Sequence, residues 1–210
     1  MTTAKDLFII TLHPGAKQPV GQGDLSLALA GAELIDLIDA GTVTVDDDRI
    51  VPGGPPTLDD RLAVEAVAGL TRQPPYEQIE DWLWRRGRDL SAAYQTALEQ
   101  DGELTRKRSG GAPFGSRRVE LVDTPARRRA VSRWEEKEPV LYALALAVGI
   151  GSDRPDRPDR PDRPDDEPDL ADDAVTAVVA AVHDAVMELE AVRQRRSIEG
   201  AAFANLWRGV

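Results

Sequence analysis

The stretch DLSLALAGAELIDLIDAGTVTVDDDRIVP, residues 24–52, decides the fold. Its apolar side chains recur at three- and four-residue steps, which is typical of a helix with one buried stripe. They are Leu27, Leu34, Ile35, Leu37 and Ile38. Gly41 is expected to end this helix, because a residue without Cβ adopts the left-handed turn at no steric cost. Two short strands, 42–45 and 49–51, are expected to follow. The sequence therefore predicts a buried helix that leads into a small hairpin.

Further helices are expected on both sides of this unit, where apolar residues recur at helical spacing between capping residues, Gly and Pro. Their ranges are 2–12, 57–70, 76–85, 88–100, 125–134, 139–148 and a long helix from residue 170. In the range 57–70, Leu62 and Val64 are among the side chains available for burial. The nearly all-apolar range 139–148 is far too short to cross a bilayer and is interpreted as a core helix.

A second hairpin is expected after Gly102, with strands at 103–108 and 117–122 joined by the Gly-rich segment 109–116. It is basic on both arms and uncharged at its tip. Its candidate membrane or oligomer contacts are Arg106, Lys107, Arg108, Pro113, Phe114, Arg117 and Arg118. An apolar tip between basic flanks suits an anionic membrane surface, where each nearby cation contributes about 1 kcal/mol. The alternative is a solvated hairpin whose charges keep the strand edges from aggregating.

The segment 151–169 contains an internal repeat, Asp-Arg-Pro in tandem. Proline at every third position excludes a helix, and too few apolar residues are present to support a core. We interpret it as a disordered insertion, and we favour an expanded low-complexity loop over a partner-binding tail. The expected organisation is one domain, with its N-terminal part at 1–150 and a long helix and tail at 170–210 that pack back on it. The side chains expected to dock from the tail are Phe203, Leu206 and Trp207.

Length and composition favour a soluble protein. The chain has 210 residues, of which 41% are hydrophobic, so it can form one sizeable core. The absence of Cys excludes disulfides and thiolate metal sites. Residues 1–12 lack the basic start and long apolar run of a signal peptide, and no segment is long and apolar enough to span a bilayer. A cytoplasmic protein is therefore expected.

Charge is unevenly distributed within a net charge of −11. Residues 151–173 contain ten acids and four Arg, a net charge of −6, whereas 104–134 contain nine Lys or Arg and two acids, a net charge of +7. The acidic total disfavours a general nucleic-acid binder. A winged-helix DNA binder would also use a helix and hairpin like those at 24–52, but the acidic tip Asp46–Asp48 would then face the phosphates.

The sequence contains no catalytic constellation. His13 and His183 have no metal-ligand spacing with the carboxylates. There is no P-loop, no GxGxxG and no GxSxG. Gly21-Gln22-Gly23 precedes the core helix and could cradle a phosphate, although two glycines are weak support for such a site. We therefore expect a protein that is not an enzyme, with no metal and no cofactor.

The segment Trp82-Leu83-Trp84-Arg85-Arg86-Gly87-Arg88 places three guanidinium groups beside two aromatic rings. Arginine is suited to phosphate, because its planar fork donates two parallel hydrogen bonds. Arg85, Arg86 and Arg88 are therefore the candidate residues for binding a phospholipid headgroup.

The order of these pieces resembles the Golgi phosphoprotein 3 family, the eukaryotic phosphoinositide effectors and their bacterial relatives. The resemblance runs from about Asp6 to Trp134 and is clearest in LALAGAELIDLIDAGTV (27–43), LEQDGEL (98–104) and VDTPARRR (122–129). It implies a mainly α fold, a single globular helical domain with a central apolar helix bundle, peripheral amphipathic helices and a projecting β-hairpin. It also implies, as in the eukaryotic members, phosphatidylinositol 4-phosphate in a basic pocket, a hairpin inserted at the membrane, and glycosyltransferase tails as partners.

The family's headgroup pocket uses one Trp and three Arg. On this sequence the Trp position falls in 21–23, where there is no aromatic residue, and two of the Arg positions are Ala30 and Ser91. The third Arg position matches Arg88. Arg85 and Arg86 are close enough in sequence to compensate from one turn away.

We therefore expect a non-enzymatic, peripheral membrane or adaptor protein of bacterial origin. Its expected ligand is an anionic phospholipid or phosphoinositide headgroup at the cytoplasmic face of the membrane, and no nucleic acid. The alternative is a protein–protein interaction module, in which the Arg-rich hairpin binds an acidic partner or a second copy of the chain, without lipid.

Overall fold

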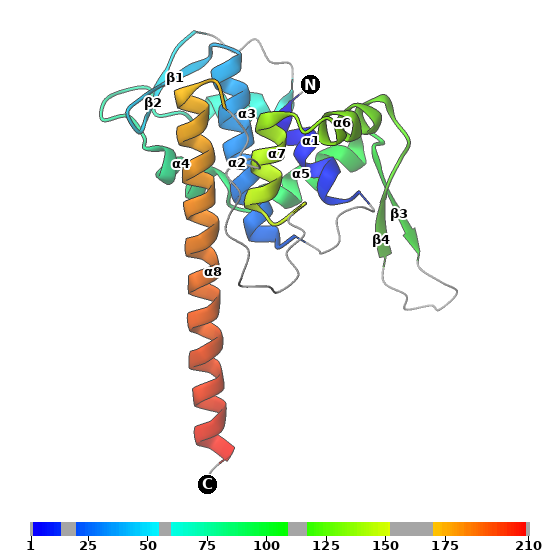
Figure 1. The fold of residues 1–210 in the computed structure, drawn as a ribbon, viewed down its shortest axis with the longest axis vertical. Helices are drawn as coiled ribbons and strands as arrows, with labels where there is room; N and C mark the ends of the chain where they lie inside the picture. The colour runs from blue at the N-terminus through cyan, green and yellow to red at the C-terminus, as the bar shows by residue number, and fades with distance from the viewer. Residues whose placement is uncertain (1, 14–19, 55–59, 109–116, 152–169, 209–210) are drawn as a thin grey trace.

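The structure, a computed structural model, describes residues 2–13, 20–54, 60–108, 117–151 and 170–208, with side chains described except at 107–108, 117–118 and 200–208. Within these residues the fold consists of helices and two antiparallel hairpins (Figure 1), which confirms the mainly α class. The helices are α1 (Thr3–Thr11), α2 (Gln22–Asp39), α3 (Arg61–Ala68), α4 (Ile79–Arg86), α5 (Leu90–Gln100), α6 (Pro125–Glu135), α7 (Pro139–Ala147) and α8 (Asp173–Arg208). The strands are β1 (Val43–Asp46), β2 (Arg49–Pro52), β3 (Leu104–Arg108) and β4 (Arg117–Leu121).

Helix α2 lies at the centre of this arrangement (Figure 1). It is buried without a break from Leu25 to Ile35, where the sequence pattern predicted a single buried stripe. That prediction was too narrow, because α1, α4, α5, α7 and α8 all contact α2. A small residue permits the close approach of α8, since a Cβ added at Gly31 would collide with Val182. The other helices are thus assembled around α2.

The end of α2 and the first hairpin follow the predicted pattern. Gly41 has a φ of 64°, the left-handed conformation that ends a helix. Strands β1 and β2 then pair antiparallel, with Val43 opposite Pro52. The Ile50 N–H donates to the carbonyl oxygen of Glu77 at 2.9 Å. This bond fixes the chain that enters α4 to the hairpin at the end of α2.

Helices α1, α5 and α6 form the side of the domain that carries the second hairpin (Figure 1). Strands β3 and β4 pair antiparallel from Leu104 opposite Leu121 to Arg108 opposite Arg117, which confirms the predicted hairpin. Within the described chain they pair with no other strand, and β3 contacts the body of the domain at α5. The tip residues Pro113 and Phe114 lie outside the described residues.

Helix α8 is one long helix whose second half extends beyond the body of the domain (Figure 1). Its buried side chains are Val175, Val178, Val182 and Ala185. Leu189 still packs against the core, whereas all side chains from 194 to 199 are exposed. We expected a tail that docks on the domain through Phe203, Leu206 and Trp207; the helix continues to Arg208, and these three side chains lie outside those that the structure describes. No proline interrupts α8, so the backbone has no local reason to turn back.

Two details of the sequence prediction differ from the structure. A start at Thr57 or Asp59 was expected for the third helix; α3 begins at Arg61, because the Asp60 carboxylate caps it by accepting from the Leu62 and Ala63 N–H groups at 2.9 and 3.1 Å. Val64 is 46% exposed instead of buried, since it lies two positions after the buried Leu62 and faces the other side of the helix. None of the helices in the described ranges is long and apolar enough to cross a membrane.

Candidate functional site

Arg85, in the last turn of α4, is held by groups of its own chain. Its Nε and Nη2 donate to the two carboxylate oxygens of Glu77 at 2.6 and 2.7 Å, and Nη2 also donates to the carbonyl oxygen of Gly69 at 3.1 Å. The guanidinium lies 5.1 Å from the centre of the Trp82 ring, within range of a cation–π contact. The side chain remains 45% exposed, so an external anion could still approach it.

Arg86 faces the interior and neutralises a buried carboxylate. Its Nε and Nη2 donate to Glu33 at 2.6 and 2.9 Å, and Nη2 donates to the carbonyl oxygen of Leu62 at 3.0 Å. The hydroxyl of Tyr94 donates a further bond to Glu33 at 3.0 Å. Burial raises the pKa of Glu33, and the hydrogen bonds from Arg86 and Tyr94 oppose this shift. The structure therefore gives the Arg86 guanidinium an internal partner.

Arg88 lies in the connection between α4 and α5 and is exposed. Among the described residues it forms no hydrogen bond or ion pair. The connection lies close against α2, since a Cβ added at Gly87 would be 3.2 Å from the carbonyl oxygen of Ser26. At the start of α5, the Ser91 N–H donates to the Ser26 hydroxyl at 3.0 Å. Arg88 is therefore an available cation beside the first turns of α2.

Two other parts of the headgroup pocket that the family resemblance implied have a role in helix packing. Ala30 is fully buried, and its carbonyl oxygen accepts a hydrogen bond from the Trp82 indole at 3.1 Å. Gly21 and Gly23 lie where α8 crosses the start of α2, and a Cβ added at Gly23 would be 2.8 Å from Leu189. This close approach gives a structural reason for the glycines that we had considered as a phosphate cradle.

A cation that the sequence analysis did not single out lies at the same end of α2. Nη1 of Arg193 donates to both carboxylate oxygens of Asp24, at 2.8 and 2.7 Å. Arg193 follows Leu189 by four residues and so continues the face of α8 that packs on α2. This four-residue spacing was the signal in the sequence that could have placed Arg193 on the packed face of α8.

The second hairpin places like charges opposite one another. Lys107 is paired with Arg118 and Arg108 with Arg117 in the strand register. The strand register therefore brings basic residues opposite one another, and their side chains lie outside those that the structure describes. Nearer the body of the domain, Arg106 is already neutralised, because its Nε donates to Glu99 at 2.8 Å.

A family model described as Golgi phosphoprotein 3 (GPP34) matches residues 4–189. The chain belongs to the Golgi phosphoprotein 3 family. The family is one of non-enzymatic phosphatidylinositol 4-phosphate effectors. The match extends from α1 to Leu189, so the projecting part of α8 and Arg193 lie beyond it. A comparison with curated proteins finds no match.

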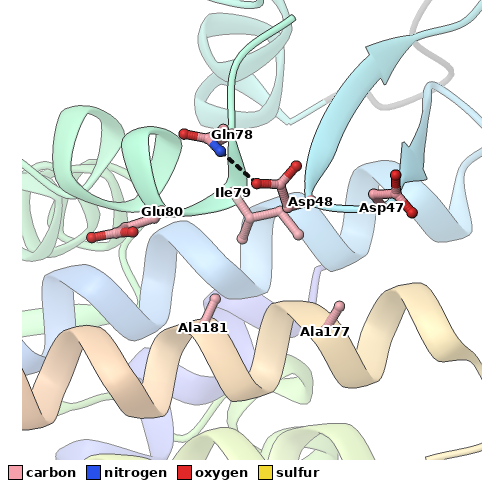
Figure 2. Close-up of a pocket in the computed structure, with 7 residues that line it drawn as sticks. All are labelled: Asp47, Asp48, Gln78, Ile79, Glu80, Ala177 and Ala181. Carbon is pink, nitrogen blue, oxygen red and sulfur yellow. Dashed lines mark hydrogen bonds between the residues drawn. The ribbon is translucent and has the colours of Figure 1, made fainter.

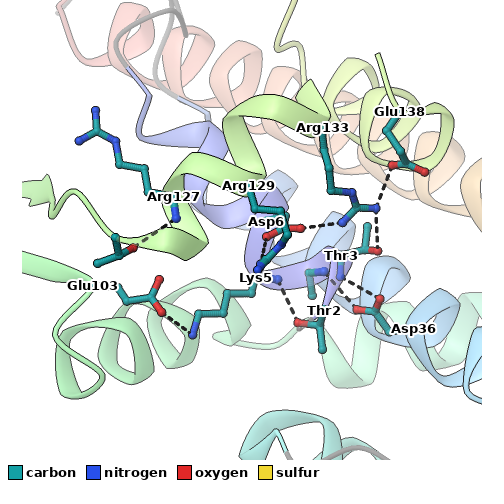
Figure 3. A network of polar contacts seen from close by, with 12 residues as sticks. Thr2, Thr3, Lys5, Asp6, Asp36, Glu103, Arg127, Arg129, Arg133 and Glu138 are labelled. Carbon is teal, nitrogen blue, oxygen red and sulfur yellow. Dashed lines mark hydrogen bonds and ion pairs between the residues drawn. The ribbon is translucent and has the colours of Figure 1, made fainter. Parts of the chain in front are cut away.

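In this Golgi phosphoprotein 3 family member, part of the basic segment 104–134 is used inside the fold (Figure 3). Arg129 and Arg133 of α6 donate to the two oxygens of the buried Asp6 carboxylate at 2.7 and 2.6 Å, and Arg133 also pairs with Glu138 at 3.0 Å. These bonds join α6 to α1. The net charge of this segment therefore overstates the positive charge available to a ligand.

A shallow pocket lies between the first hairpin, the start of α4 and α8 (Figure 2). Its floor is formed by Ala177 and Ala181, and its polar lining includes Asp47, Asp48 and Glu80. Carboxylates at this density repel a phosphate group. The pocket is thus unsuited to the anionic ligand expected for the family, and the cations beside the first turns of α2 are the better candidate site.

Proposed function

We propose that this protein is a non-enzymatic, peripheral membrane-binding protein of the Golgi phosphoprotein 3 family that binds anionic phospholipid headgroups. The observation that carries the proposal is Arg88, because it is exposed and has no partner among the described residues. It is also the position at which the sequence retains an arginine of the family's headgroup pocket. Its place in the short connection between α4 and α5, which lies against the start of α2, would present the guanidinium to a phosphate at the surface.

The three arginines of the candidate site have different roles in this proposal. Arg88 contacts the headgroup. Arg85 contributes positive potential from one turn away, because its guanidinium is bound to Glu77 yet partly exposed. Arg86 supports the site from inside the fold through Glu33.

The hairpin is the proposed second membrane contact. The opposed cations at 107, 108, 117 and 118 would be stabilised by an anionic lipid surface, and Pro113 and Phe114 would enter its apolar part. Attachment would thus combine one headgroup site with a basic hairpin. Two contacts on a single surface reinforce each other, because the second forms at high effective concentration.

Liposome co-sedimentation tests the proposal with phosphatidylcholine vesicles that contain phosphatidylinositol 4-phosphate or phosphatidylserine. The charge reversal Arg88→Glu should reduce binding at least tenfold, since each cation near an anionic surface contributes about 1 kcal/mol and the reversal adds a repulsive charge. Arg72→Glu is the matched control, because Arg72 is exposed in the connection that enters α4, at the opposite end of that helix from Arg88. Failure of the parent protein to bind anionic vesicles at low salt would overturn the proposal.

The second candidate function is protein binding or self-association through the hairpin. The observation in its favour is that β3 and β4 pair only with each other within the described chain. A two-stranded hairpin is marginally stable by itself and exposes two strand edges that another chain can extend. Sedimentation velocity separates the two functions. In the self-association case, Phe114→Ser shifts the distribution of oligomers without lipid; in the lipid case, it changes only vesicle binding.

A further inference from the structure

The guanidinium of Arg193 lies at the start of α2, and one of its edges forms no hydrogen bond within the described chain. Nη1 makes both bonds to Asp24, and the Glu190 carboxylate also approaches Nη1, at 3.6 Å. Within the described chain, Nε and Nη2 donate to no acceptor. The Arg193 side chain as a whole is 39% exposed.

In Arg85 and Arg86, the Nε–Nη2 edge of the guanidinium binds a carboxylate. Arg85 binds both oxygens of Glu77 through Nε and Nη2, and Arg86 binds both oxygens of Glu33 in the same way. This edge is the planar fork that matches an oxyanion with two parallel hydrogen bonds. In Arg193 the same fork is open, while Asp24 keeps the side chain in place.

The guanidinium of Arg193 occupies space that two glycines leave free. Nη2 of Arg193 would be 3.3 Å from a Cβ at Gly21 and 3.0 Å from a Cβ at Gly23. A larger residue at either position would force the guanidinium to move. Because Gly21 and Gly23 have no side chains, both the Arg193 guanidinium and Leu189 can pack closely against this segment.

Arg193 and Arg88 approach the same two turns of α2. Arg193 contacts Asp24, and the residue before Arg88 lies against the Ser26 carbonyl, two positions further along α2. One cation comes from α8 and the other from the connection between α4 and α5. The two arginines thus reach the N-terminal turns of α2 from different elements, and Asp24 fixes the Arg193 guanidinium there.

We propose that Arg193 is a second headgroup-binding residue, which receives the terminal phosphate of a phosphomonoester headgroup on its open Nε–Nη2 fork while Arg88 supplies the second cation. This inference rests on the proposed lipid-binding function and adds Arg193 to the residues of its site. The site would thus use a residue of α8 beyond the segment that the family model matches. Asp24 acts as the positioning residue, because it fixes the guanidinium through Nη1.

The test uses the charge-conserving substitution Arg193→Lys, with Arg195→Lys as its matched control. Lysine keeps the positive charge but lacks the planar fork. Arg195 is exposed on the same helix and is two residues away.

Binding is measured by co-sedimentation with phosphatidylinositol 4-phosphate vesicles and with phosphatidylserine vesicles of equal surface charge. Arg193→Lys should weaken binding to the phosphomonoester vesicles about tenfold, the loss of roughly one charge-assisted hydrogen bond, and should leave phosphatidylserine binding unchanged.

A competition arm identifies the group that is recognised. Inorganic phosphate should displace the parent protein from the phosphomonoester vesicles more effectively than chloride at equal ionic strength, and Arg193→Lys should remove this difference. The inference is overturned if Arg193→Lys and Arg195→Lys behave alike, or if both lipids are affected equally by Arg193→Lys. It is also overturned if phosphate acts no differently from chloride. If the parent binds neither type of vesicle, the proposed function itself fails, which is a different result from unaltered binding by Arg193→Lys. Thermal melting of each variant verifies that the fold is retained.

Discussion

Glu33 and Arg86 form a buried two-point ion pair that joins the middle of α2 to the last turn of α4, with N–O distances of 2.6 and 2.9 Å. The Glu33 side chain is 2% exposed, so its charge has no access to water. A buried charge that loses its partner retains the full cost of desolvation. The pair therefore makes Arg86 part of the fold, in addition to any effect it has on the nearby surface.

Removal of Arg86 should destabilise the protein strongly. We expect Arg86→Ala to lower the free energy of unfolding by about 3–5 kcal/mol, because Glu33 is left buried and unpaired. Arg85→Ala should cost about 1 kcal/mol or less, since its ion pair is partly exposed. Urea denaturation of both variants measures the difference. The double substitution Glu33→Met with Arg86→Met should be less destabilised than Arg86→Ala, and equal losses in Arg86→Ala and Arg85→Ala would contradict the assignment.

The close contact between α2 and α8 makes a second prediction. Gly31→Ala should gain about 0.5–1 kcal/mol from the lower flexibility of alanine in a helix. The added Cβ would collide with Val182, however, and overpacking in a core typically costs about 1–3 kcal/mol. We therefore expect a net loss of stability in chemical denaturation. Val182→Ala in the same chain should restore part of it by removing the colliding methyl groups, and a stabilised Gly31→Ala protein would show that α8 packs less closely than in this structure.

The helices and hairpins could be predicted from sequence because their signals are local. Gly41 after the apolar repeat and the paired basic strands mark elements within a few residues of each other. The ion pairs could not be predicted in this way, because Glu33 and Arg86 are brought together only by the packing of α4 on α2. Glu33 did carry an unused signal, since a carboxylate within a long apolar helix requires a partner. Arg193 was missed for a similar reason, as its position depends on how α8 crosses the start of α2.

Asp36 should make stability depend on pH in the weakly acidic range. Its carboxylate accepts hydrogen bonds from the N–H groups of Thr3 and Ala4, at 2.8 and 3.2 Å (Figure 3), and so holds the start of α1. Burial raises the pKa of Asp36 to about 6, and the nearby Asp39 charge adds to the effect of burial, while the bonds from Thr3 and Ala4 oppose it. The folded protein thus binds a proton more tightly than the unfolded chain does.

The sign of the dependence follows from this difference. The stabilising contribution of the Asp36 proton is complete below the ordinary pKa of 3.8 and is lost as the pH rises through about 6. The shift corresponds to about 3 kcal/mol at most. We expect the parent protein to lose stability relative to Asp36→Asn between about pH 4 and about pH 7, as measured by urea midpoints. A constant difference between the two proteins over this range would contradict a raised pKa for Asp36.

The exposed end of α8 should be dispensable for folding. Side chains from 194 to 199 are exposed, and Ile198 retains 70% of its accessible surface, so this part of the helix buries little apolar area against the domain. A chain that ends after Arg196 keeps Leu189 and the Arg193–Asp24 pair, which are the last contacts with α2 in the described chain. Its melting temperature should equal that of the parent protein. A chain that ends after Glu188 is the comparison, because it also removes both of those contacts and should melt at a lower temperature. If the shorter deletion alone lowers the melting temperature by several degrees, the tail contributes to the domain, as the sequence first suggested, and α8 does not act as a free extension.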